Sequence, residues 1–99
     1  MIYHVGTFKL VDPSRADEAI EALYRLKDIV PGTLDYKAGK CFLPTPTNAD
    51  VCLIGVFDTK EHYEEYMNHP IHTDEVAPFV IELCDFEIIE RMRSCCFEI

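Results

Sequence analysis

The chain has 99 residues, of which 48% are hydrophobic, and this is the size of one small globular domain spanning residues 1–99. Eighteen acidic against nine basic side chains give a net charge of -9. The Lys and Arg residues are scattered, so neither a nucleic acid nor an anionic membrane surface is expected as a partner.

The amino-terminal stretch "MIYHVGTFKL" has no basic residue ahead of an apolar run and carries His4 and Lys9, so it does not resemble a signal peptide. No segment approaches the ~20 apolar residues that a membrane span needs. The five cysteines form an odd set without a C-x-x-C pair, which argues against a disulfide framework and a zinc site. We therefore expect a cytoplasmic protein with reduced thiols, and we expect Cys52 to be a small core residue.

The first predicted element is a strand from Ile2 to Val11. Apolar side chains and a histidine fall on both of its sides, with Ile2, His4, Phe8 and Leu10 on one and Tyr3, Val5 and Val11 on the other. This strand is therefore expected to be covered on both faces.

A helix is predicted to follow, because Asp12 can cap free N–H groups and Pro13 suits the first helical position. Apolar residues recur at spacings of three and four from Ala16 to Val30, which predicts an amphipathic helix ended by Pro31 and Gly32.

Two further strands are predicted, from Thr33 to Leu43 and from Val51 to Phe57, separated by the loop "PTPTNAD". The segment "VCLIGVF" is almost entirely apolar, which is typical of a central strand.

Asp58 and Glu61 resemble a capping box that opens a helix from Thr59 to Asn68, with Tyr63, Tyr66 and Met67 on its inner side. Pro70 disfavours helical geometry at the residue before it, so this helix is expected to end there. A second helical piece from Thr73 to Leu83 and a fourth strand, "DFEIIERMR", complete the chain, and "SCCFEI" is expected to extend that strand towards a partner.

The predicted fold is α+β, with the order β-α-β-β-α-α-β and the helices on one face of a four-stranded antiparallel sheet. Because the strands are apolar on both faces, the sheet face that the helices do not cover would expose apolar side chains to water. A chain this short buries only about two-thirds of the surface that its unfolded form exposes, so pairing would also stabilise it. A second copy related by a two-fold axis would cover the face, which predicts a homodimer.

The sequence resembles the stress-responsive dimeric α+β barrel (Dabb) family. The resemblance rests on "HVGTFK", on Gly39 and above all on "FDTKEHYEEYMNHPIH", followed by "VAPFV" and "DFE". It implies a ferredoxin-like protomer that forms a dimeric α/β barrel with a small pocket between each sheet and its helices.

Members of this family include plant proteins linked to stress and a polyketide cyclase that makes olivetolic acid. The resemblance to that cyclase implies that His72 is a general base, that Tyr66 is its hydroxyl partner and that His4 approaches the same pocket. The cyclase has a further histidine on its third strand, and "DVCLIGVF" has no counterpart to it.

The segment "YMNHPIH" also allows a structural interpretation, in which His69 and His72 cap backbone groups around the proline and Tyr66 packs in the core. A metal site is disfavoured, because His69 and His72 are not spaced in a zinc pattern. Two functions stay open: a dimer that binds a small apolar ligand or acts in a stress response, and a cofactor-free, polyketide cyclase-like enzyme in which His72 and Tyr66 are catalytic.

Overall fold

The computed structural model describes residues 1–43, 45–84 and 92–99. Its elements, in chain order, are the strand β1 (Ile2–Phe8), the short 3-10 helix η1 (Pro13–Arg15), the helix α1 (Ala16–Tyr24), the strands β2 (Thr33–Lys40) and β3 (Val51–Phe57), the helix α2 (Lys60–Asn68), the π-helical turn η2 (Ile71–Val76), the helix α3 (Ala77–Cys84) and the strand β4 (Met92–Glu98).

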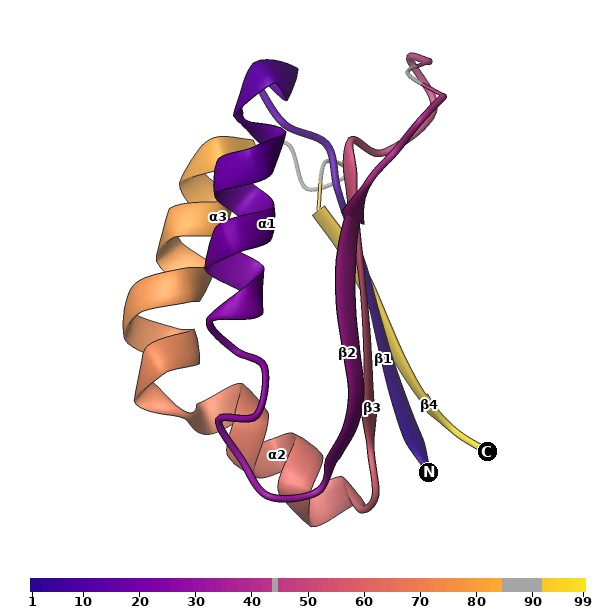
Figure 1. The fold of residues 1–99 in the computed structure, drawn as a ribbon, viewed down its shortest axis with the longest axis vertical. Coiled ribbons are helices and arrows are strands. Elements are labelled where there is room, and N and C mark those ends of the chain that lie inside the picture. Colours follow the sequence, from indigo (N-terminus) through magenta and orange to yellow (C-terminus); the bar gives the residue numbers. More distant parts are fainter. Residues whose placement is uncertain (44, 85–91) are drawn as a thin grey trace.

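The four strands form one antiparallel sheet in the order β2-β3-β1-β4, so β1 and β3 are central and β4 is an edge strand. All three α-helices lie on one side of this sheet, and its other side is open (Figure 1). The arrangement is the predicted ferredoxin-like α+β fold. No helix among the described residues is long and apolar enough to cross a membrane.

The first helix is shorter than predicted. Asp12 does cap the turn at Pro13, because its carboxylate accepts a hydrogen bond from the Ser14 backbone N–H at 3.0 Å. However, α1 ends at Tyr24, and the chain leaves the helix through Asp28, which has a φ of 61°. Aspartate tolerates this left-handed backbone better than most residues do. The apolar spacing of three and four residues thus continues past the end of the helix.

The prediction that Asp58 is the N-cap residue of α2 is wrong. The Thr59 hydroxyl, not the Asp58 carboxylate, accepts the hydrogen bond from the backbone N–H of His62, at 3.2 Å. Asp58 instead contacts the His62 ring, with Oδ1 2.6 Å from Nδ1. The helix end before Pro70 is as predicted.

Most of the predicted fourth strand, residues 85–91, lies outside the described residues. The described strand β4 runs from Met92 to Glu98, so the predicted extension of the strand through "SCCFEI" is confirmed as far as Glu98. β4 pairs with β1 along its whole length, with Met92 opposite Phe8 and Glu98 opposite Ile2.

The two faces of the sheet differ in burial. On the helix face of β3, Val51, Leu53 and Phe57 are at most 3% exposed, whereas Ile54 on the open face is 37% exposed. Cys52 also lies on the open face and is exposed, so the prediction that it is a core residue is wrong. Its strand is central, but the helices that the structure describes cover one side of it and leave Cys52 on the other.

Candidate functional site

The site is built around a break in the helical backbone after α2. In an unbroken helix the Met67 carbonyl would accept a hydrogen bond from the backbone N–H of Ile71. Here Pro70 interrupts the pattern, and the Ile71 N–H bonds to Nδ1 of His69 at 3.1 Å instead. The Met67 carbonyl is then bonded by Nδ1 of His72 at 2.9 Å. The Ile71 N–H and the Met67 carbonyl, which would bond to each other in an unbroken helix, are therefore each bonded to a histidine ring instead.

This hydrogen bond fixes the tautomer of His72. A carbonyl oxygen can only accept, so the Nδ1 atom of His72 carries the hydrogen and donates it to Met67. In the neutral ring Nε2 is then the acceptor. Burial lowers the pKa of His72, and the hydrogen bond to Met67 opposes part of that shift. His72 is thus a neutral imidazole at neutral pH, with a basic nitrogen on the side away from Met67.

Tyr66 lies on α2 and is only 1% exposed. Its hydroxyl is 2.9 Å from the hydroxyl of Tyr36, which reaches it from β2. Burial raises the pKa of Tyr66 to about 12, against a smaller lowering by the hydrogen bond to Tyr36. Burial also raises the pKa of Tyr36, and the neighbouring Tyr66 adds to the rise. Both phenols are therefore protonated at neutral pH and can donate hydrogen bonds.

Tyr36 was not predicted as a site residue, and the register of β2 explains its position. Thr33 pairs with Phe57 and Asp35 with Val56, so Leu34 is an extra residue in a bulge. The bulge sets Tyr36 opposite Gly55, on the helix face of the sheet. A Cβ atom on Gly55 would lie 3.3 Å from the Tyr36 ring. The glycine in an otherwise apolar strand was the one sequence signal of this close approach.

His4 reaches the same place from β1, where it is 7% exposed. Its ring centroid is 5.9 Å from that of Tyr66, and the His72 centroid is 5.4 Å from Tyr66 on another side. Nδ1 of His4 is 3.5 Å from the Tyr63 hydroxyl. Burial, together with the nearby His72, lowers the pKa of His4 to about 4. Both imidazoles around Tyr66 are therefore neutral at neutral pH.

His4, Tyr66 and His72 line one cavity of about 280 Å³ between the sheet and the helices. The structure thus brings together His4, Tyr66 and His72, the three residues singled out from the sequence. Most of the remaining wall is apolar and comes from Phe8, Leu23, Leu26, Leu53, Val76 and Val80. No aspartate or glutamate is among the described residues that line the cavity. The cavity is therefore mostly apolar, with His4, Tyr66 and His72 as neighbouring polar groups in its wall.

The remaining histidines, His69 and His62, do not line this cavity. Among residues 1–43, 45–84 and 92–99, no group of three or more His, Cys, Asp or Glu side chains could hold a metal ion. His69 is engaged by the Ile71 N–H, and His62 lies on the outer side of α2 beside Asp58, where its pKa is raised by that carboxylate.

Comparison with protein families gives a match to the stress responsive A/B barrel domain, over residues 2–93. Comparison with curated protein sequences gives no match.

Similar folds are found among solved structures. A dimeric ferredoxin-like protein of unknown function from Thermobifida fusca has 22% identity and a TM-score of 0.77, over 99% of this chain and 90% of that one. A second dimeric ferredoxin-like protein, from Jannaschia sp., has 18% identity and a TM-score of 0.79, over 99% and 98%. The hydroxynitrile lyase of Passiflora edulis has 15% identity and a TM-score of 0.77, over 99% and 92%.

Proposed function

We propose that this chain, which belongs to the stress responsive A/B barrel domain family, forms a homodimer that binds a small, largely apolar molecule in the cavity beside His72. The proposal is based on the cavity itself, whose wall is mostly apolar and includes the polar side chains of His4, Tyr66 and His72. The thiols of Cys41, Cys52, Cys95 and Cys96 are not joined in disulfides, which supports a place for the protein in the cytoplasm.

The open face of the sheet supports the homodimer. Ile54 and Phe97 are 37% and 43% exposed there, and the Tyr3 and Phe97 rings stack with centroids 5.3 Å apart. Two solved structures with this fold are described as dimeric. A second copy placed face to face would bury these side chains and close a barrel.

Sedimentation at micromolar concentration should therefore give twice the chain mass of 11.4 kDa. Ile54→Glu places a charge on the open face and should shift the protein towards the monomer. Glu64→Gln, on the exposed side of α2, is the control and should leave the mass unchanged. A parent protein that sediments as a monomer would refute this part of the proposal.

A second function, proton transfer without a cofactor, is favoured by the tautomer of His72. Because Nδ1 donates to Met67, Nε2 is the proton acceptor of a ring that lines the cavity. A neutral imidazole can act as a general base at neutral pH, and a protonated phenol such as Tyr66 can stabilise a developing enolate. The same fold is used by a hydroxynitrile lyase. Under this proposal the substrate is a small carbonyl compound with an acidic α-proton, such as a β-dicarbonyl.

The experiment uses His72→Asn, because the amide of asparagine can still donate to the Met67 carbonyl but offers no basic nitrogen. We expect the variant to keep its stability within about 1 kcal/mol. It should lose any acceleration of deuterium exchange at the α-carbon of a β-ketoester in D2O. His69→Asn changes the same residue type at the same break outside the cavity, so it should retain the acceleration.

The two proposed activities are separated by their outcomes. Cavity binding seen by NMR without faster exchange would support the ligand-binding function and refute proton transfer. If neither binding nor exchange were detected with a panel of small carbonyl and aromatic compounds, both would be refuted.

A further inference from the structure

The loop between β2 and β3 projects from the end of the sheet on the side away from the helices (Figure 1). Its second half, residues 46–49, lines a hollow of about 490 Å³ together with Thr7 of β1 and Arg93 of β4. Thr7 pairs with Arg93, and the next residue of β1, Phe8, lines the cavity on the helix side. Because successive side chains of a strand point to opposite faces, Thr7 and Arg93 lie on the open face. The loop therefore borders the open face of the sheet.

The first half of the loop carries two neighbouring apolar side chains that are exposed. Phe42 is 88% exposed and Leu43 is 57% exposed, so nearly the whole Phe42 ring faces water in the single chain. Scattered hydrophobic residues are normal on a protein surface, but aromatic side chains are enriched where proteins contact each other. A partner that covered both side chains would remove a continuous apolar surface from water.

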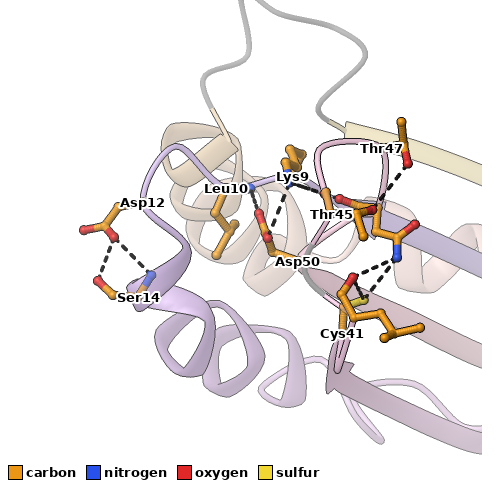
Figure 2. A network of polar contacts seen from close by, with 10 residues as sticks. Lys9, Leu10, Asp12, Ser14, Cys41, Thr45, Thr47 and Asp50 are labelled. Atoms are coloured by element: carbon orange, nitrogen blue, oxygen red, sulfur yellow. Dashed lines mark hydrogen bonds and ion pairs between the residues drawn. The ribbon is translucent and has the colours of Figure 1, made fainter.

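Hydrogen bonds hold this loop against the end of β1 (Figure 2). The Lys9 ammonium group donates to the carbonyls of Thr45 and Asn48, at 3.3 Å and 3.1 Å. It also lies 3.7 Å from the Asp50 carboxylate. The side-chain amide of Asn48 donates to the Leu43 carbonyl at 2.8 Å. A loop that is already held in place loses little conformational entropy when it binds, so its exposed side chains are suited to an interface.

The charge of the loop suits contact with a second copy of this chain. Each copy carries a net charge of -9, so two copies repel each other in general. Residues 41–49, with the sequence CFLPTPTNA, contain no charged side chain. The residue that follows, Asp50, has the Lys9 ammonium group beside it. The loop can therefore approach a second copy without adding to the repulsion.

We infer that this loop contacts the second copy in the homodimer, and that Phe42 and Leu43 are apolar anchors that the second copy covers. The loop borders the open face through which the two copies are proposed to pack, so its contacts would continue that interface. In a two-fold dimer each contact occurs twice, once from each loop. The inference rests on the homodimer of the proposed function, and it adds to that interface residues that lie outside the sheet.

The first test uses Phe42→Trp, because the chain contains no tryptophan and the new indole is then the only one. Sedimentation of the same samples gives the oligomeric state. We expect the indole of the dimer to emit at a shorter wavelength than an indole in water, and to be poorly quenched by iodide, because the second copy covers it. Dilution to the monomer should return its emission and its quenching to those of an exposed indole.

The second test measures the dissociation constant of the dimer in Phe42→Ser and Leu43→Ser. Each variant removes an anchor from both loops, so each constant should rise at least about tenfold. Val11→Ser is the matched control, because Val11 is 58% exposed but lines a groove with Ile81 and Leu83 of α3, on the helix side. It should leave the constant unchanged.

The outcomes separate the loop contact from the homodimer itself. If sedimentation shows a dimer in which iodide quenches the indole as strongly as in the monomer, the inference is overturned and the homodimer stands. The same conclusion holds if the two serine variants dimerise like the parent. If the parent is a monomer at micromolar concentration, the proposed homodimer fails, and the inference fails with it.

Discussion

The hydrogen bond between the hydroxyls of Tyr36 and Tyr66 predicts a measurable coupling between two residues that lie 30 positions apart in the sequence. The bond is 2.9 Å long and the two side chains are 2% and 1% exposed. Tyr36→Phe removes one hydroxyl and leaves the other without this partner in a buried place, which costs about 1–3 kcal/mol. Tyr66→Phe should cost a similar amount. The double variant removes both hydroxyls and should be no less stable than either single variant.

The coupling energy in this double-mutant cycle should therefore be at least about 1 kcal/mol. Urea unfolding measures it, with all four proteins at one concentration because a dimer's stability depends on concentration. Tyr24→Phe is the control, since that side chain is 40% exposed and water can replace its contacts with Ala38. It should lose less than about 1 kcal/mol. Additive losses for Tyr36 and Tyr66 would show that the pair is not a buried, mutually satisfied unit.

Two further predictions concern the surroundings of this pair. Gly55→Ala would bring a Cβ atom to 3.2–3.3 Å from the rings of Phe57 and Tyr36 and should lower the free energy of unfolding by about 1 kcal/mol. Gly39→Ala is the control, because its Cβ atom would meet nothing within 4 Å and should not crowd a neighbour. Equal losses of stability in the two variants would refute the packing argument. The pKa of His4 is lowered to about 4 in the folded state, so the unfolded chain binds more protons between there and pH 6.5, and stability falls as the pH drops through that window. Urea unfolding should show about 2 kcal/mol more loss between pH 7 and pH 5 in the parent than in His4→Gln, and identical losses would contradict a buried neutral His4.

The strand and helix patterns each placed one residue of the site correctly, His4 on the first strand and Tyr66 on the inner side of the helix after Asp58. The alternation along the first strand placed His4 on the same side as Ile2 and Phe8, and that side is the one covered by the helices. Period-two alternation separates the faces of a strand by geometry alone, so this assignment needed no tertiary information. It could not say which face of the central strand would be covered, and Cys52 was placed on the wrong one.

Tyr36 could not have been found in this way. Without the bulge at Leu34, pairing from Thr33 and Phe57 would set Tyr36 opposite Ile54, on the open face. A shift of one residue moves every following side chain to the other face of the sheet. The position of Tyr36 is therefore decided by one irregular residue, Leu34. The glycine nearest to it, Gly32, was assigned to the end of the preceding helix, and it does not say that an extra residue follows in the strand.

The geometry around Pro70 also shows why the two interpretations of "YMNHPIH" are not exclusive. The structural interpretation needs a histidine nitrogen to cap a free backbone group, and Nδ1 of His72 does this for Met67. The chemical interpretation needs a basic nitrogen, and the same hydrogen bond makes Nε2 that nitrogen. Both nitrogens belong to one ring, so His72→Ala would leave the Met67 carbonyl without its partner and remove the basic nitrogen in one step. A loss of activity in that variant would therefore say nothing about proton transfer. Only a replacement that keeps the donor and removes the acceptor, as His72→Asn does, tests the chemistry apart from the fold.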